Sequence, residues 1–94
     1  MRVFWTRASL DSLEAITDYI AQHNPAAALR LVDDIPDRTN ALLSANPMAG
    51  RKGRTDGTRE LVLSGTPHIV AYRVRDCVEV LAVMHGARQW PDDF

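Results

Sequence analysis

The sequence is poor in cysteine and in long apolar runs, and each shortage excludes a class of protein. Cys77 is the only cysteine, which excludes an internal disulfide and a cluster of thiolate metal ligands. No apolar run approaches the roughly 20 residues that cross a bilayer, and the N-terminus lacks the apolar region of a signal peptide. We therefore expect a cytoplasmic protein without membrane association.

Metal-binding and nucleotide-binding patterns are also missing. The three histidines, His23, His68 and His85, fall in different predicted elements, and none has a partner at the spacing of a metal ligand pair. The glycine-containing segment GRKG at 50–53 is not followed by the Lys-Ser or Lys-Thr pair and the helix of a P-loop. The sequence predicts neither a metal nor a cofactor.

Charge is nearly balanced over the chain but unevenly distributed along it. The formal net charge is −1, and Lys52 is the only lysine. Residues 1–49 carry four arginines against six acids, whereas residues 51–75 carry six cations against two acids. Such a basic patch can hold an anionic partner, but a nearly neutral protein gains little long-range attraction to nucleic acid.

Ninety-four residues suffice for one domain with one modest core, so we expect residues 1–94 to form a single domain. Residues 2–6 are short, apolar and aromatic, which predicts a strand. Helical spacing of apolar residues then predicts one helix from about Ser9, its N-cap, to His23. A second predicted helix has Asn24 as N-cap and reaches about Ala45, with a kink or short break at Pro36.

The C-terminal half is predicted to be β-structure. Residues 46–59, which contain three glycines and four cations, predict a loop. Apolar runs at 59–63, 68–74 and 78–84 predict three strands joined by short turns, hence an antiparallel meander. On the middle strand one face is predicted to carry Val70, Tyr72 and Val74, and the other Ile69, Ala71, Arg73 and Arg75. The order β-α-α-β-β-β indicates an α+β two-layer domain, in which a helical hairpin packs on a small, mainly antiparallel sheet. The first strand must join an edge of the meander or lie between its members.

This pattern resembles the RelE/ParE superfamily of toxins from bacterial type II toxin–antitoxin modules. The segments that carry the resemblance are VFWT, SLEAITDYIAQHNPAAA, NPMAGRKG, GTRELVL, PHIVAYRV and VEVLAVMHGARQWP; RELVL, IVAYRV and HGARQWP are the most specific. The resemblance spans essentially the whole chain. It implies the β-α-α-β-β-β fold and a small toxin that a co-expressed antitoxin silences.

The superfamily divides by target: RelE-like members cut mRNA in the ribosomal A site, whereas ParE-like members act on DNA gyrase. A metal-independent ribonuclease needs proton-transfer groups and cations. The candidates here are His85 and Tyr72 for proton transfer, and Arg59 and Arg73 for phosphate. A structural role for His85, and pairing of the two arginines with acids or backbone carbonyls, are equally open.

Two features favour a non-enzymatic gyrase inhibitor. RelE-like ribonucleases are strongly basic and lysine-rich, whereas the isoelectric point here is about 6.3. The tail after His85 ends in two acids before Phe94, which suits mRNA phosphates poorly. The alternatives are a ribosome-dependent mRNA endoribonuclease and a non-toxic, partner-binding module that acts in operon autoregulation.

Contact residues can be nominated for both partners. Target binding is assigned to the loop cations and the tail, namely Arg51, Lys52, Arg54, Arg88 and Trp90. Antitoxin binding is assigned to Leu10, Leu13 and Leu29, because a domain of this size leaves apolar surface that it cannot cover itself. A disordered antitoxin tail would lay a helix in a groove or add a strand to the sheet.

Overall fold

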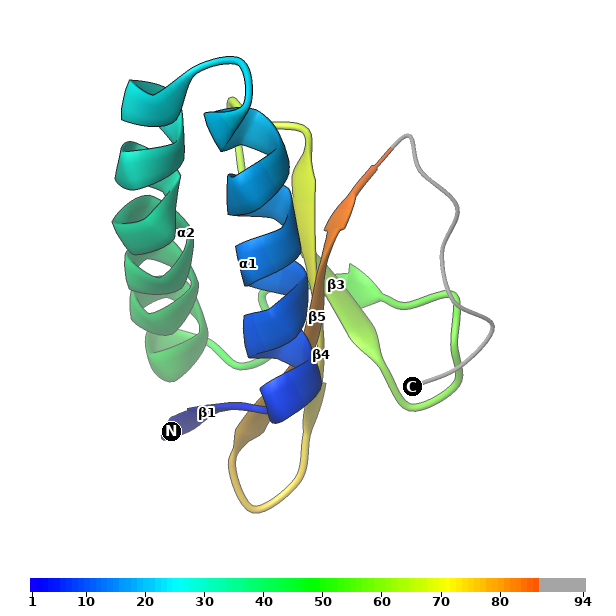
Figure 1. Cartoon of the computed structure of the whole chain (residues 1–94). Coiled ribbons are helices and arrows are strands. Elements are labelled where there is room, and N and C mark those ends of the chain that lie inside the picture. The colour runs from blue at the N-terminus through cyan, green and yellow to red at the C-terminus, as the bar shows by residue number, and fades with distance from the viewer. Residues whose placement is uncertain (87–94) are drawn as a thin grey trace.

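The computed structural model describes residues 1–86 and places two helices on one side of a β-sheet (Figure 1). The elements in chain order are β1 (Val3–Trp5), α1 (Arg7–Ala21), α2 (Pro25–Ala45), β2 (Arg51–Lys52), β3 (Arg59–Val62), β4 (His68–Val74) and β5 (Val78–His85). The predicted α+β architecture, with a helical hairpin packed on a mainly antiparallel sheet, is confirmed.

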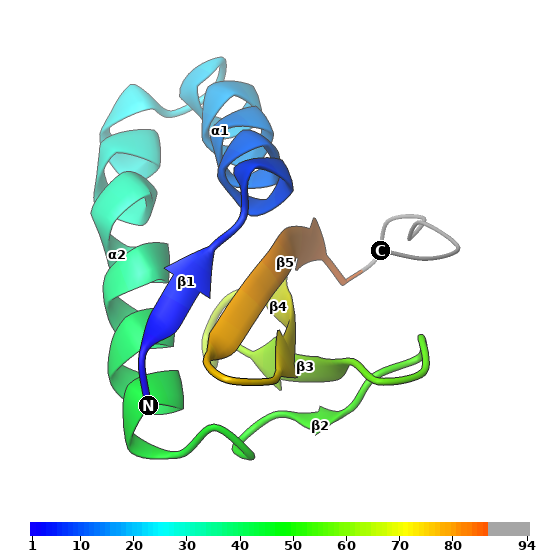
Figure 2. The ribbon, with the colours of Figure 1, turned by 90° about the horizontal axis from the view of Figure 1, so that it is seen from below.

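The strand order is β1-β5-β4-β3-β2 (Figure 2). Strands β2 to β5 pair antiparallel, as the predicted meander requires, and β1 joins the edge as a parallel neighbour of β5. Strand β2 was not predicted and lies inside the segment 46–59 that we expected to be a loop. Its two residues pair with β3, and Arg51 is opposite Glu60. An edge strand this short needs no alternation of apolar and polar residues, so the sequence pattern does not reveal it.

The helix starts follow from their caps. Helix α1 begins two residues earlier than predicted, because Thr6 and not Ser9 is the N-cap: its hydroxyl oxygen accepts from the Ser9 N–H at 3.1 Å. Ser9 is buried inside the first turn. At α2 the predicted N-cap is correct, since the side chain of Asn24 accepts from the Ala27 N–H at 3.1 Å and Pro25 opens the helix.

The predicted break at Pro36 is absent, and α2 runs without interruption through this residue. Proline removes the N–H that would bond the carbonyl four residues earlier, that of Val32, and Val32 lies on the exposed side of the helix. On the other side Ile35, Thr39 and Leu43 are fully buried at helical spacing. This packing therefore outweighs the local preference of proline.

Neither helix in residues 1–86 is long and apolar enough to span a membrane.

The two faces of the sheet differ in what covers them. On the helix side, Val70 and Tyr72 of β4 pack with residues of both helices in the main core. On the other side, Ile69 and Ala71 form a smaller apolar cluster with Ala82 of β5. This alternation is the one that β4 predicts from its sequence, and it decides which side chains share a surface.

Candidate functional surface

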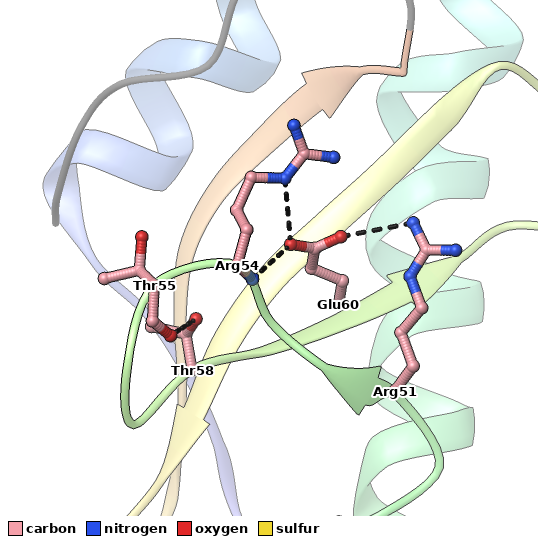
Figure 3. A network of polar contacts seen from close by, with 5 residues as sticks. All are labelled: Arg51, Arg54, Thr55, Thr58 and Glu60. Atoms are coloured by element: carbon pink, nitrogen blue, oxygen red, sulfur yellow. Dashed lines mark hydrogen bonds and ion pairs between the residues drawn. The ribbon is translucent and has the colours of Figure 1, made fainter.

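A buried carboxylate, that of Glu60 in β3, organises the cations of the segment before it (Figure 3). Its Oε1 accepts from Arg51 Nη2 at 3.2 Å, and its Oε2 accepts from the Arg54 backbone N–H at 3.0 Å and from Arg54 Nε at 3.3 Å. Only 4% of Glu60 is exposed, whereas the Arg51 and Arg54 side chains remain 58% and 50% exposed. Glu60 thus holds two guanidinium groups whose side chains remain half or more exposed.

The protonation of Glu60 follows from these contacts. Burial raises the pKa of its carboxyl, but the hydrogen bonds from the Arg54 backbone and from the two guanidinium groups outweigh burial and leave the pKa below its ordinary value. Glu60 is therefore ionised at neutral pH. With Arg51 and Arg54 it forms a group of net charge +1.

The turn that carries Arg54 is tied down by its own backbone. The Gly53 N–H donates to the Thr58 carbonyl at 2.8 Å, and the Thr58 N–H donates to the Thr55 carbonyl. The Thr58 hydroxyl donates to the same Thr55 carbonyl (Figure 3). A Cβ at position 53 would lie 2.9 Å from the Thr58 carbonyl oxygen, so only glycine fits there. The backbone of this turn thereby presents Arg54 to Glu60.

A second ion-paired group lies on the same face of the sheet. Arg73 Nε donates to Glu79 Oε1 at 2.7 Å across the β4–β5 pair, and Arg75 Nε lies 3.7 Å from the same oxygen. Arg73 follows Ala71 by two residues, and Ala71 is opposite Glu60, so both groups face away from the helices. We call Arg51, Arg54, Arg73 and Arg75, with Glu60 and Glu79, the arginine face.

Arg59 and Tyr72 lie on the other side, where they fasten the connection between α2 and β2. Arg59 Nε donates to the Gly50 carbonyl at 3.0 Å, which is one of the pairings that the sequence left open. The buried Tyr72 hydroxyl donates to the Pro47 carbonyl and accepts from the Gly50 N–H, both at 2.8 Å. These hydrogen bonds hold the chain that leads into Arg51.

The four residues nominated for ribonuclease chemistry are therefore not brought together in residues 1–86. His85 is opposite His68 at the end of the β4–β5 ladder, and by alternation both belong to the helix side, with Tyr72. Arg73 is on the arginine face. Arg59 is opposite Tyr72 on the helix side, where its guanidinium donates to the Gly50 and Met48 carbonyls. Arg73, the other arginine nominated for phosphate, lies on the opposite face of the sheet from His85 and Tyr72.

The predicted partner-binding residues are distributed as follows. Leu10 and Leu29 are 48% and 72% exposed on the helices, whereas Leu13 is only 8% exposed and belongs to the core. Leu13 is therefore corrected to a packing residue, because it lies on the side of α1 that faces the sheet. Arg51 and Lys52 form β2. Arg88 and Trp90 lie outside the described residues.

Sequence reasoning missed His68, which is 4% exposed and whose Nδ1 has no hydrogen-bond partner within the described part of the chain. Its ring lies edge-on to that of His85, with 6.1 Å between centroids. Burial, and secondarily the charge of His85, lower the pKa of His68. The only signal in the sequence was a polar residue at the start of an apolar strand.

Stability is expected to fall below pH 6.5 because of His68. Its pKa is lowered in the folded chain, so the unfolded chain binds the proton first and folding weakens as the pH falls, by at most about 1.4 kcal/mol per pH unit. Urea unfolding between pH 7.5 and 5.5 measures this slope. His68→Phe should reduce the slope, while His23→Phe, at an exposed histidine, should not. Equal slopes in the wild type and His68→Phe would contradict the assignment.

Both the sequence and the fold are similar to those of known toxins. Residues 3–90 match the family model of the ParE toxin of the type II toxin–antitoxin system parDE. The chain is 44% identical over 90 residues to "Putative toxin Y4kP" of Sinorhizobium fredii, which covers 96% of this chain and 93% of that protein.

Two further relatives agree. "Toxin RelE2" of Caulobacter vibrioides is 36% identical over 88 residues, which are 93% of this chain and 97% of that protein. A solved structure described as the chromosomal ParDE toxin–antitoxin system from P. aeruginosa has the same fold, with a TM-score of 0.81 and 32% identity over 90% of this chain and 95% of that one.

Proposed function

Because this chain belongs to the ParE toxin family and is a toxin of a type II toxin–antitoxin system, we propose that it inhibits DNA gyrase and does so by binding. The observation that carries this proposal is that the arginine face and the candidate proton-transfer groups lie on opposite faces of the sheet. In residues 1–86 the arginine face offers guanidinium groups held by carboxylates, while Tyr72 and His85 lie on the helix side. Arg59 shares the helix side with them, but its guanidinium donates to the carbonyls of Gly50 and Met48. A ribonuclease needs proton-transfer groups and available cations at one phosphate.

The arginine face suits recognition. Arg51, Arg54 and Arg75 each keep half or more of their side-chain surface exposed while an acid holds them in place. Fixing a long cationic side chain before binding reduces the entropy lost in the complex. Arginine is also enriched among the residues that dominate protein–protein binding energies. A surface of this kind fits an acidic region of a protein target.

A supercoiling assay with purified gyrase tests the proposal. The toxin is expected to block introduction of supercoils at concentrations that stop growth in vivo, and toeprinting of translated mRNA should show no new cleavage in the A site. Unimpaired gyrase together with A-site cleavage would favour the ribosome and mRNA as target, as in RelE-like proteins. Unaffected growth on expression without antitoxin would favour a non-toxic module in operon autoregulation.

Replacing Arg51 and Arg54 together by alanine is expected to raise the concentration for half-maximal target inhibition by about tenfold or more, because arginine is enriched among the interface residues whose truncation costs more than about 1 kcal/mol. Dose–response curves in the supercoiling assay give this shift. Arg7→Ala is the matched control, since Arg7 is an exposed arginine on α1 whose ion-pair partner is Asp11. An equal shift for Arg7→Ala would indicate a general effect of charge and would argue against the arginine face.

We further propose that the cognate antitoxin binds the helix side. Leu10 of α1 and Leu29 of α2 are exposed there, as are Tyr19, Val32 and Leu42. This much exposed apolar surface on two adjacent helices is typical of a partner site. Target and antitoxin would then contact different sides of the domain.

A further inference from the structure

Two cations without an acidic partner lie side by side at the outer edge of the sheet. Lys52 of β2 is directly opposite Arg59 of β3, so both side chains are on the same side of the sheet. Like charges directly opposite each other on paired strands are destabilising. In residues 1–86 neither of the two forms an ion pair, whereas every arginine of the arginine face has a glutamate partner. The position therefore lacks an anion.

The guanidinium of Arg59 is held in place beside Lys52 by backbone carbonyls. Its Nε donates to the Gly50 carbonyl at 3.0 Å, and its Nη2 donates to the Met48 carbonyl at 3.3 Å. Moving the guanidinium away from Lys52 would break both hydrogen bonds. Nη1 has no partner within the described part of the chain. The fold thus fixes a half-buried cation next to a second one and leaves some of its donors unused.

A cavity of about 320 Å³ adjoins the two cations, which is at the small end of the range of ligand sites. Its lining residues within the described part of the chain are Met48, Lys52, Gly57, Thr58, Arg59 and Val74. None of these residues is acidic and none belongs to a helix, and β2 is the outermost strand of the sheet (Figure 2). Neither Tyr72 nor His85 lines the cavity, so it brings no candidate proton-transfer group to a ligand.

We infer that this cavity binds a dianionic phosphate group, as free phosphate or as a phosphate monoester. Such a group carries a charge of about −1.5 to −2 at pH 7 and three strong acceptor oxygens. It can therefore balance both cations while it accepts from the Lys52 ammonium and from Nη1 of Arg59. A carboxylate or a phosphodiester, with a single charge, would leave one cation unbalanced. The inference does not depend on which target the toxin inhibits.

The lysine content of the chain gives a direct test. Lys52 is the only lysine, so labelling lysine with carbon-13 gives one side-chain Cε signal in an NMR spectrum, and this signal reports on the cavity. The full chain is titrated with inorganic phosphate and with phenyl phosphate, each against chloride at the same ionic strength. The Cε signal is expected to shift and reach saturation with phosphate but not with chloride. Tighter binding of phenyl phosphate would identify a monoester as the ligand, and equal or weaker binding would identify free phosphate.

A variant tests the cause as well as the binding. Lys52→Gln removes one cation at an exposed side chain and should weaken calorimetrically measured phosphate binding by about tenfold or more. It should also raise the thermal midpoint in phosphate-free buffer of low ionic strength, because the like-charge pair is gone. Arg2→Gln is the matched control, since Arg2 is an exposed cation that does not line the cavity. It should leave phosphate affinity unchanged.

Three results would overturn the inference. Equal shifts of the Lys52 signal with phosphate and chloride would show general screening by salt. An equal response to acetate, or to duplex DNA without terminal phosphates, would show that the cavity does not select a dianion. Unchanged phosphate affinity in Lys52→Gln would place the bound ion elsewhere on the toxin. The titrations of the wild-type chain decide the first two points even where a variant fails to fold.

Discussion

Replacing Glu60 by glutamine is expected to lower the free energy of unfolding by about 1–3 kcal/mol and to weaken target inhibition. The amide keeps the shape of the side chain but loses the charge that holds Arg51 and Arg54. Its NH2 group must also face a donor where an oxygen now accepts, so at least one of the three hydrogen bonds to this carboxylate is lost. Urea unfolding measures the first effect, and the supercoiling assay measures the second.

The pH dependence of this loss distinguishes charge from shape. Because the pKa of Glu60 is lowered in the folded chain, the stability it contributes is present above its ordinary pKa of 4.5 and is lost as the pH falls through the lowered value. The difference between the wild type and Glu60→Gln should therefore narrow from pH 7 to pH 3. A constant difference would show that packing of the carboxamide, and not loss of charge, causes the effect.

The matched control is Asp56→Asn, which makes the same change of charge at an exposed position of the same turn. It should leave stability and target inhibition close to those of the wild type, since surface substitutions usually change stability by less than about 0.5 kcal/mol. If the Glu60→Gln and Asp56→Asn variants inhibit the target equally well, Arg51 and Arg54 act without being held by residue 60. That result would contradict the positioning role of Glu60.

Local sequence patterns predicted the elements well where one physical cause dominated. The alternation of β4 separated Val70 and Tyr72 from Ile69 and Ala71, because a strand has only two faces. Asn24 was recognised as an N-cap because its side chain satisfies a free N–H next to Pro25. Such features depend on neighbours within a few residues.

The errors occurred where distant contacts decided the outcome. Pro36 stays within α2 because Ile35 and Thr39 hold the helix against the core. Leu10 and Leu13 are both leucines of the first predicted helix, and only the docking of α1 on the sheet shows which of them is buried. Tertiary packing overrides local propensity in this way whenever the buried side of an element is well filled.

The candidate site was predicted in its composition but not in its organisation. The excess of cations in residues 51–75 correctly indicated a basic surface, and Arg51, Arg54 and Arg73 do lie on one face. Glu60 was only counted as one of the two acids in this segment, because its role depends on its pairing with Arg51 across β2 and β3. A two-residue edge strand leaves no periodic signal in the sequence.

Replacing Gly50 by alanine is expected to lower the free energy of unfolding by about 2–4 kcal/mol. A Cβ at this position would lie 2.7 Å from both Cε1 and the hydroxyl of Tyr72, and 2.9 Å from the Glu60 carbonyl oxygen. The backbone must therefore move, and the hydrogen bond from the Gly50 N–H to the Tyr72 hydroxyl is lost with it. Thermal unfolding should show a midpoint lower by roughly 4–8 °C for each kcal/mol.

Gly86→Ala is the control for this change, because its Cβ would meet the flexible end of Ile69 at 3.3 Å, an atom that can move aside. Tyr72→Phe removes the hydroxyl without adding an atom, so the pair Gly50→Ala and Tyr72→Phe forms a double-mutant cycle. The double variant should lose less stability than the sum of the two single losses, since both single variants break the same hydrogen bond. Full additivity would mean that this bond contributes nothing. Because Gly50 immediately precedes Arg51, its displacement should also weaken target inhibition, which links the packing of Tyr72 on the helix side to the arginine face on the other.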